Sequence, residues 1–251
     1  MSRQPMFNVP GVVLAIVAVL IAVHVGLQQL SPQNERWWLL ALAFIPARFA
    51  PSAPMLPGYG WAEVTSWLSH ALVHGDALHL GINIAFLLAF GAACVRRIGT
   101  ARFLALLLLS TIAGAATYLA INGPANVVMV GASGGISGLL GAVLRFLFPA
   151  TSIKGAALAD VAPLVPRLSL RGMWRVTPAR LAVLSWLALN LIMAVVLPAS
   201  GMTAGIAWEA HLGGFAVGLL GFGYFDTVHG EIDDIPRHLG SLDTEPGDDD
   251  S

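Results

Sequence analysis

The stretch VPGVVLAIVAVLIAVHVGLQQL, residues 9–30, is uncharged and apolar except for one histidine and two glutamines. A helix needs about 20 mostly apolar residues to cross the ~30 Å hydrocarbon layer of a bilayer. The stretch therefore predicts a membrane-spanning helix. Its length and its flanking residues do not fit a cleavable signal peptide.

Similar apolar stretches follow along the chain. A short run, Trp67–Leu78, is predicted to extend the second span upstream. The sequence thus predicts an all-α polytopic membrane protein with six transmembrane helices. The five further spans are His79–Val95, Ala101–Ile121, Gly134–Pro149, Arg180–Ala199 and Trp208–Phe225.

The composition of the whole chain supports this prediction. Of 251 residues, 57% are apolar and 11% are charged, against the ~25% charged residues of a soluble domain. These values exclude a disordered chain, a nucleic-acid-binding domain and a water-soluble enzyme. The single cysteine, Cys94, excludes an internal disulfide framework and a cysteine-rich metal site.

The net charge of −1 is unevenly distributed. Residues 226–251 carry nine acids and one base, a charge of −8, whereas residues 1–225 carry twelve bases and five acids, a charge of +7. With six spans, eleven of the thirteen bases fall on one side and only Arg36 and Arg48 on the other. The positive-inside rule then places both termini in the cytoplasm.

The spans divide the chain into three regions. Residues 1–8 form a short cytoplasmic N-terminus, residues 9–226 the membrane domain, and residues 227–251 an acidic tail that is predicted to be solvated and disordered. The long outer connection, residues 31–66, contains the pair Trp37 and Trp38. Its apolar run is too short to cross, so we expect it to lie in or dip into the outer leaflet.

Polar side chains at membrane depth are costly and therefore suggest function. His79 and Asn83 are four residues apart and share one helix face. Nearer the outer surface, His70 and His74 have the same spacing, which allows either a metal site or structural hydrogen bonds to backbone carbonyls. The structural interpretation is favoured, because no glutamate follows in a metalloprotease pattern.

Two spans begin with small residues at helical spacing, a pattern that lets helices approach closely. If these two stripes pack together, Ser133 meets His211 at the outer end of the seam. The segment Gly131–Gly135 also fits G-x-S-x-G, but that motif needs a soluble α/β sheet and is rejected here. The stripes are Ser133, Ser137 and Gly141 on one span, and His211, Gly214 and Gly218 on the other.

The depth of these polar residues can be derived from the helical rise of 1.5 Å per residue. His79 lies ~25 Å, Ser133 ~24 Å and His211 ~22 Å from the inner ends of their spans. All three groups therefore lie roughly 5–8 Å below the outer surface of the membrane. Independent core residues would not be expected to share one depth.

These residue types suit nucleophilic catalysis. A serine hydroxyl needs a base within hydrogen-bond reach, and His211 can serve Ser133 in this way. No carboxylate is evident to orient the histidine, because Glu209 should point elsewhere on its helix. His79, the Asn83 amide and the Ser133 N–H could stabilise the oxyanion.

Taken together, Gly131-Ala-Ser133-Gly134, Ala210-His211-x-x-Gly214-x-x-x-Gly218 and His79-x-x-x-Asn83 resemble the rhomboid family of intramembrane serine proteases. The resemblance covers about residues 9–226. It implies a rhomboid-like bundle with a Ser133–His211 dyad, oxyanion stabilisation by His79, Asn83 and Ser133, and no metal or cofactor. The implied partners are transmembrane substrates, cut near the outer face, and membrane lipid, with no nucleic acid. A bacterial inner membrane is the expected location.

The sequence departs from the family pattern at four positions, one of which is Val95, where some members have a glutamate near the inner end of the second span. Thr65 and Ser66 replace a Trp-Arg pair in the outer loop, and Ser137 replaces an aromatic residue that often packs on the histidine. These changes bear on loop anchoring and on the orientation of His211. Two other functions stay open: a non-catalytic protein that binds membrane clients, and a transporter or channel. For the latter, His24 and Asn190 are the only hints, and both are expected to be satisfied by neighbouring helices.

Overall fold

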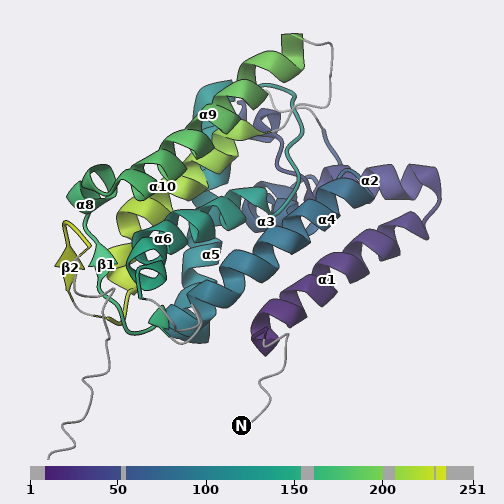
Figure 1. Ribbon diagram of the computed structural model, residues 1–251. Coiled ribbons are helices and arrows are strands. Elements are labelled where there is room, and N and C mark those ends of the chain that lie inside the picture. Colours follow the sequence, from purple (N-terminus) through teal and green to yellow (C-terminus); the bar gives the residue numbers. More distant parts are fainter. Residues whose placement is uncertain (1–8, 52–54, 154–160, 200–206, 229, 236–251) are drawn as a thin grey trace, which may run out of the picture.

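The computed structural model describes residues 9–51, 55–153, 161–199, 207–228 and 230–235, without the side chains of 196–199. Helices and loops make up this part of the chain, except for two short paired strands, β1 (Arg167–Leu168) and β2 (Glu231–Ile232). The helical elements, shown in Figure 1, are α1 (Gly11–Gln28), α2 (Pro32–Leu42), η1 (Pro46–Phe49), α3 (Ala62–Ser69), η2 (His70–Leu72), α4 (Ala77–Phe86), η3 (Leu87–Gly91), α5 (Ala92–Asn122), α6 (Ser133–Thr151), α8 (Leu170–Arg175), α9 (Thr177–Ala199) and α10 (Trp208–Phe225).

Within the described ranges, four helical stretches are long and apolar enough to cross a membrane, so the chain is an integral membrane protein with an essentially helical fold. They are Gly11–Gln28, Ala77–Asn122, Ser133–Thr151 and Thr177–Val195. The 46-residue stretch Ala77–Asn122 changes direction at Gly99, where φ is 74°. Glycine tolerates this backbone conformation because it has no Cβ. The predicted spans His79–Val95 and Ala101–Ile121 lie on either side of this turn.

The start of α4 corrects one expectation. Residues Trp67–Leu78 do not extend this helix, because the chain leaves helical geometry after η2 and re-enters it at Ala77. The carboxylate of Asp76 caps the new helix by accepting a hydrogen bond from the His79 N–H at 2.8 Å. An aspartate at this position satisfies a backbone donor that has no partner within the helix.

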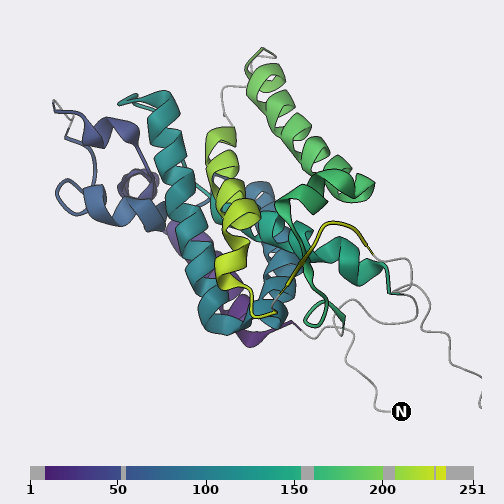
Figure 2. The ribbon, with the colours of Figure 1, turned by 90° about the vertical axis from the view of Figure 1, so that its left-hand side faces the viewer.

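The centre of the bundle is α6, which packs against α5 and α10. Of an 18-residue apolar stretch of α6, 78% is buried, against 17% of the corresponding stretches of α1 and α9. Figure 2 shows α5 and α10 side by side, with α9 at the outside of the molecule. The helices α1 and α9 therefore expose most of their side chains, as lipid-facing helices do.

Small residues bring α6 and α10 together, as the sequence predicts. A Cβ on Gly214 would collide with the Gly134 carbonyl, and one on Gly218 with the Gly138 carbonyl. The closest approach thus involves Gly134 and Gly138, each one residue after a serine of the predicted stripe. Ser137 is buried within α6, one turn after Ser133.

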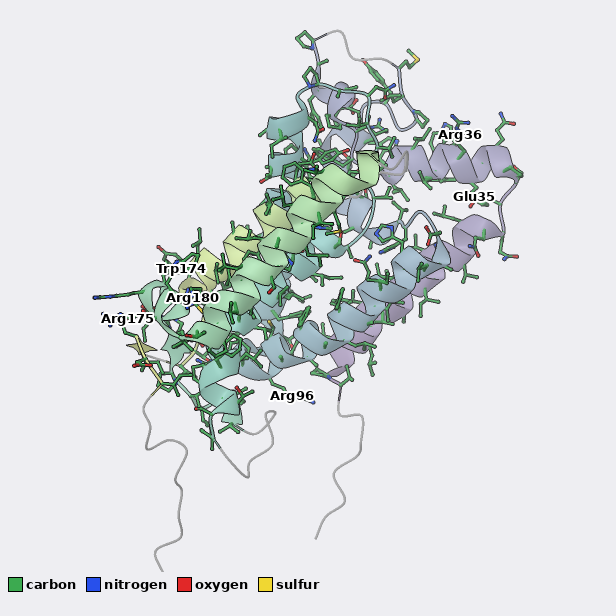
Figure 3. The ribbon with its side chains drawn as sticks, turned by 45° about the horizontal axis from the view of Figure 1, so that its top comes forward. Glu35, Arg36, Arg96, Trp174, Arg175 and Arg180 are labelled. Atoms are coloured by element: carbon green, nitrogen blue, oxygen red, sulfur yellow. The ribbon has the colours of Figure 1, made fainter. Side chains whose placement is uncertain are left out.

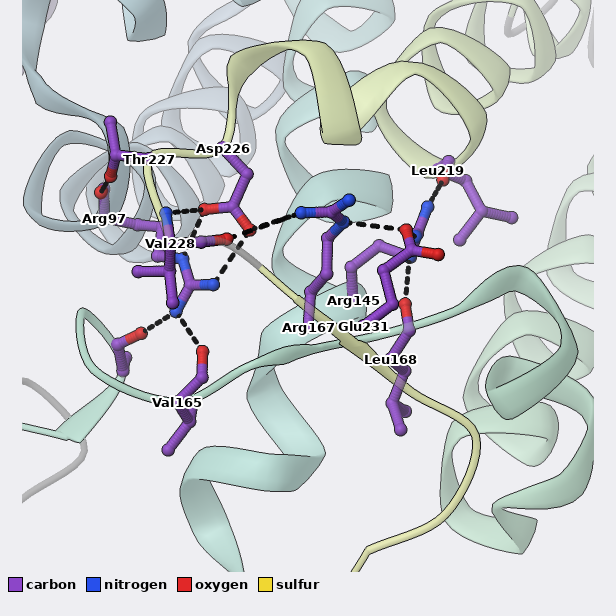
Figure 4. Close-up of polar contacts among 11 residues, drawn as sticks. Arg97, Arg145, Val165, Arg167, Leu168, Leu219, Asp226, Thr227, Val228 and Glu231 are labelled. Atoms are coloured by element: carbon purple, nitrogen blue, oxygen red, sulfur yellow. Dashed lines mark hydrogen bonds and ion pairs between the residues drawn. The ribbon is translucent and has the colours of Figure 1, made fainter.

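Five charged side chains form one network, shown in Figure 4. It lies by β1 and β2, at the end of the bundle opposite α2 (Figure 1). Arg97 donates two hydrogen bonds to Asp226, at 2.8 and 2.9 Å, and Arg145 donates one to Glu231 at 2.8 Å. Arg167 pairs with both acids. Burial opposes ionisation of the Asp226 carboxyl, but the hydrogen bonds and charge of Arg97 outweigh this effect and lower its pKa.

The same end of the molecule holds the first residues of the acidic tail against the membrane domain. Glu231 and Ile232 pair with Arg167 and Leu168 as a short parallel sheet, so the start of the acidic tail is attached to the membrane domain rather than disordered. The expectations for residues 1–8 and for 236–251 lie outside the described residues.

The outer connection is helical over much of its length. Trp37 and Trp38 on α2 are each more than 40% exposed, which suits the headgroup level. Phe44 forms an antiparallel bridge with Met129, and this bridge ties the connection to the segment that precedes α6. In Figure 3, Arg36 on α2 lies at the opposite end of the molecule from the basic residues Arg96, Arg175 and Arg180.

Candidate functional site

The structure brings Ser133 and His211 into direct contact. The Ser133 Oγ lies 2.8 Å from the His211 Nε2. Ser133 is the first residue of α6, and His211 lies in the first turn of α10. The glycine contacts between these two helices place the serine and the histidine at the same end of the seam. The pair therefore has the geometry of a nucleophile and its base.

The other ring nitrogen of His211 contacts a residue whose role the sequence analysis missed. The Asn190 Oδ1 on α9 lies 3.0 Å from the His211 Nδ1. Asn190 is buried, and its Nδ2 donates to the Trp186 carbonyl at 2.9 Å. The signal in the sequence was a single asparagine within an apolar helix, and the expectation that a neighbouring helix satisfies it is confirmed. The helical spacing alone did not indicate which residue does so.

Glu209 lies away from this contact, as predicted. It is buried and accepts a hydrogen bond from the Asn122 Nδ2 at 3.1 Å. Within the described part of the chain, the hydrogen-bond partners of the His211 ring are a hydroxyl and an amide. The predicted dyad is thus joined by a third, uncharged group.

His79 lies against the backbone that leads into Ser133. A Cβ on Gly131 would lie 2.7 Å from the His79 Nε2, so the ring occupies the space that any larger residue at this position would need. Gly131 also has a φ of 112°, which favours glycine. The imidazole thus reaches within two residues of the serine, and its predicted contact with an oxyanion stays a prediction.

Asn83 is buried one turn after His79. Its Nδ2 donates to the His79 carbonyl at 2.9 Å, and its Oδ1 is buried without a hydrogen-bond partner among the described residues. Ser133 begins α6, so its N–H belongs to the helix-start donors that have no carbonyl partner within the helix. Within the described residues, the Asn83 Nδ2 is thus engaged by a carbonyl, whereas the Ser133 N–H has no partner inside its own helix.

His70 and His74 hold the segment before Ser133. The backbone carbonyl of His70 accepts a hydrogen bond from the Gly131 N–H at 2.8 Å. The ring Nδ1 of His70 donates one to the Ser66 carbonyl at 2.7 Å. The His74 Nε2 accepts from the Ala132 N–H at 3.5 Å. The structural interpretation of His70 is confirmed, whereas His74 contacts a backbone N–H instead of a carbonyl.

Burial lowers the pKa of both His70 and His74 to about 4, and for His74 the nearby His79 and His24 add to the effect. Both rings are therefore neutral at pH 7. Among the described residues, no three His, Cys, Asp or Glu side chains lie close enough together to hold a metal ion.

The part of the chain that contains this site resembles known proteins. The family model of the Rhomboid domain matches residues 61–226, which include Ser133, His211 and the helices that carry them. The chain is 32% identical over 168 residues to RHOMBOID-like protein 4 of Arabidopsis thaliana. The aligned region covers 65% of this chain and 34% of the plant protein.

Proposed function

The chain belongs to the rhomboid family, and we propose that it is an intramembrane serine endopeptidase. The observation that carries the proposal is the 2.8 Å contact between the Ser133 Oγ and the His211 Nε2. A family match alone does not establish activity, because a fold can persist without its chemistry. The contact supports an activated serine, which the family assignment alone does not.

The proposed topology has six spans with both termini on the basic side of the membrane. Its first three crossings are α1, the residues before Gly99 and the residues after it, and α6, α9 and α10 supply the rest. The meeting of three arginines in the network at the end opposite α2 supports a cytoplasmic assignment for that end. Ser133 and His211 then lie near the outer face, as their calculated depths suggest.

The proposed chemistry follows from the two ring nitrogens of His211. The Ser133 Oγ attacks the scissile carbonyl carbon while the hydroxyl proton passes to Nε2. This attack forms a bond between the serine oxygen and the carbonyl carbon and gives a tetrahedral oxyanion. The imidazolium then returns this proton to the leaving amine as the peptide C–N bond breaks. Water, deprotonated by the same nitrogen, hydrolyses the acyl-enzyme and restores the serine hydroxyl.

Stabilisation of the oxyanion is assigned to His79, Asn83 and the Ser133 N–H. The position of His79 against Gly131 supports its assignment, and the start of α6 at Ser133 supports that of the N–H. Asn83 would need to rotate its amide, because Nδ2 donates to the His79 carbonyl here. Such donors act strongly in a site of low dielectric constant.

The proposed substrates are transmembrane segments with a locally destabilised helix. A peptide carbonyl within a regular helix is hydrogen-bonded and shielded by side chains, so attack requires an extended stretch. The site lies at the start of two helices near the outer surface, where such a stretch can enter. The alternative is a rhomboid-like protein that binds membrane clients without cutting them.

Labelling with a serine-directed fluorophosphonate tests the proposal on the purified full-length protein. We expect the wild type to be labelled and Ser133→Ala and His211→Ala to lose labelling. Ser152→Ala, at the other end of α6, is the matched control and should label normally. Labelling that survives Ser133→Ala would contradict the assignment of the nucleophile. If the wild type cleaves no helix-destabilised substrate in liposomes, the client-binding alternative is favoured.

A further inference from the structure

We propose that Asn190 is a positioning residue that fixes the tautomer and the ring orientation of His211. The inference deepens the proposed function and rests on it. Asn190 is buried, although it lies in α9, where only 17% of an 18-residue apolar stretch is buried. An apolar side chain would cost less than an amide at this depth. The amide nevertheless stands beside the proposed base.

The hydrogen bonds of Asn190 fix the direction of its amide. The Trp186 carbonyl can only accept, so the Nδ2 of Asn190 faces it. The Oδ1 then faces His211 and can accept a hydrogen bond but cannot donate one. The two contacts together leave one arrangement of the amide.

This arrangement determines where the imidazole carries its proton. Because the Asn190 Oδ1 is an acceptor, the His211 Nδ1 must carry the hydrogen that joins them at 3.0 Å. A neutral imidazole with a protonated Nδ1 has its lone pair on Nε2. The Nε2 is the atom 2.8 Å from the Ser133 Oγ, so the lone pair that must accept the serine proton faces it.

The same contact makes the reacting pair depend on the position of α9. This helix joins α10 through two adjacent contacts, the Asn190–His211 hydrogen bond and the stacking of Trp186 on Phe215 at 3.9 Å between ring centroids. If α9 moves away from α10, His211 loses its Nδ1 acceptor and the other tautomer becomes accessible. The His211 ring thus has a hydrogen-bond partner at each of its two nitrogens only while α9 packs against α10.

Two variants test the role of Asn190, with Leu191→Ala as the matched control. Asn190→Leu keeps the branched shape and the number of heavy atoms of the side chain but removes the acceptor. We expect its kcat to fall by about 10- to 100-fold with a smaller change in KM. Asn190→Asp places a carboxylate beside the imidazole and stabilises the imidazolium. We therefore expect the acidic limb of its pH–kcat/KM profile to move to higher pH. Leu191, 64% exposed on the same helix, should tolerate alanine with little effect.

A spectroscopic measurement gives a result that does not depend on activity. With ¹⁵N-labelled histidine in detergent-solubilised protein, the His211 ring should show a protonated Nδ1 in the wild type and a mixture of tautomers in Asn190→Leu. A purely structural role for Asn190 would leave the tautomer and the pH profile unchanged, and either result would overturn the inference. If the wild type neither labels nor cleaves, the proposed function fails while the tautomer result still decides the role of Asn190.

Discussion

The side chains of Arg97 and Asp226, 129 residues apart in the sequence, form a fully buried ion pair at the end of the bundle opposite α2. Arg97 precedes the turn at Gly99, and Asp226 follows the last residue of α10. Arg97 also donates from Nη1 to the carbonyls of Ala162 and Val165. One guanidinium thus connects the ends of two helices and the connection that follows α6.

Removal of one partner of this ion pair should destabilise the fold strongly. For Asp226→Asn we expect a loss of about 3–5 kcal/mol in the free energy of unfolding, because the buried charge of Arg97 remains without its counter-ion. Thermal unfolding in detergent measures this effect. Arg171→Ala is the control, since Arg171 is 69% exposed and lies 4.0 Å from Asp233. It should cost about 0–1 kcal/mol. Equal losses in the two variants would contradict the role of the buried pair.

Acid should destabilise the protein in two pH ranges. The folded-state pKa of His70 and of His74 is lowered by burial to about 4, against 6.5 for an exposed imidazole. The unfolded state therefore binds protons first, and stability is lost as the pH falls from about 6.5 towards 4. Asp226, whose pKa is lowered, contributes stability that is lost at still lower pH, as the carboxyl protonates in the folded state.

The measurement for the first range is the midpoint of thermal unfolding between pH 7 and pH 4. A loss of about 1 kcal/mol lowers this midpoint by roughly 2–4 °C for a chain of this size. His74→Ala removes one of the two groups and should flatten the dependence, whatever its effect at pH 7. A midpoint in the wild type that does not change from pH 7 to pH 4 would rule out this prediction.

The seam between α6 and α10 gives a third prediction. In Gly218→Ala the new methyl group meets the Gly138 carbonyl, a backbone atom that cannot rotate away. The helices must separate, which typically costs about 1–3 kcal/mol. Because His211 and Gly218 share α10, we also expect slower fluorophosphonate labelling of Ser133. Gly221→Ala on the same helix is the control, because its Cβ meets nothing within 4 Å.

Much of this architecture was predictable from the sequence because membrane helices leave a local signal. Runs of apolar residues mark the helices, and Gly214 and Gly218 mark the face on which α10 packs. The same spacing placed Ser133 next to His211, and the structure joins them at 2.8 Å. Their catalytic roles stay a prediction.

What could not be predicted depends on contacts between segments that are remote in sequence. Asn190 is a single polar residue in an apolar helix, and helical periodicity does not reveal which neighbour it faces. The acidic tail looked solvated from its composition, but Glu231 pairs with Arg145 and Arg167. A count of charges identifies the acids, whereas only the fold shows which of them reach a base.

The stacking of Trp186 on Phe215 leads to the last prediction, which concerns α9. The two rings lie 3.9 Å apart, nearly parallel at 13°, one helical turn from the Asn190–His211 contact. An aromatic pair of this kind contributes about 0.5–1.5 kcal/mol beyond its buried area.

Trp186→Ala should therefore loosen α9 at the position where it holds the acceptor of the His211 Nδ1. We expect labelling of Ser133 to slow by about tenfold, which corresponds to 1.4 kcal/mol. Leu189→Ala, on an exposed position of the same helix, is the control. If Trp186→Ala labels as fast as the wild type, the seating of α9 does not limit the reaction, and Asn190 must be held by its own helix alone.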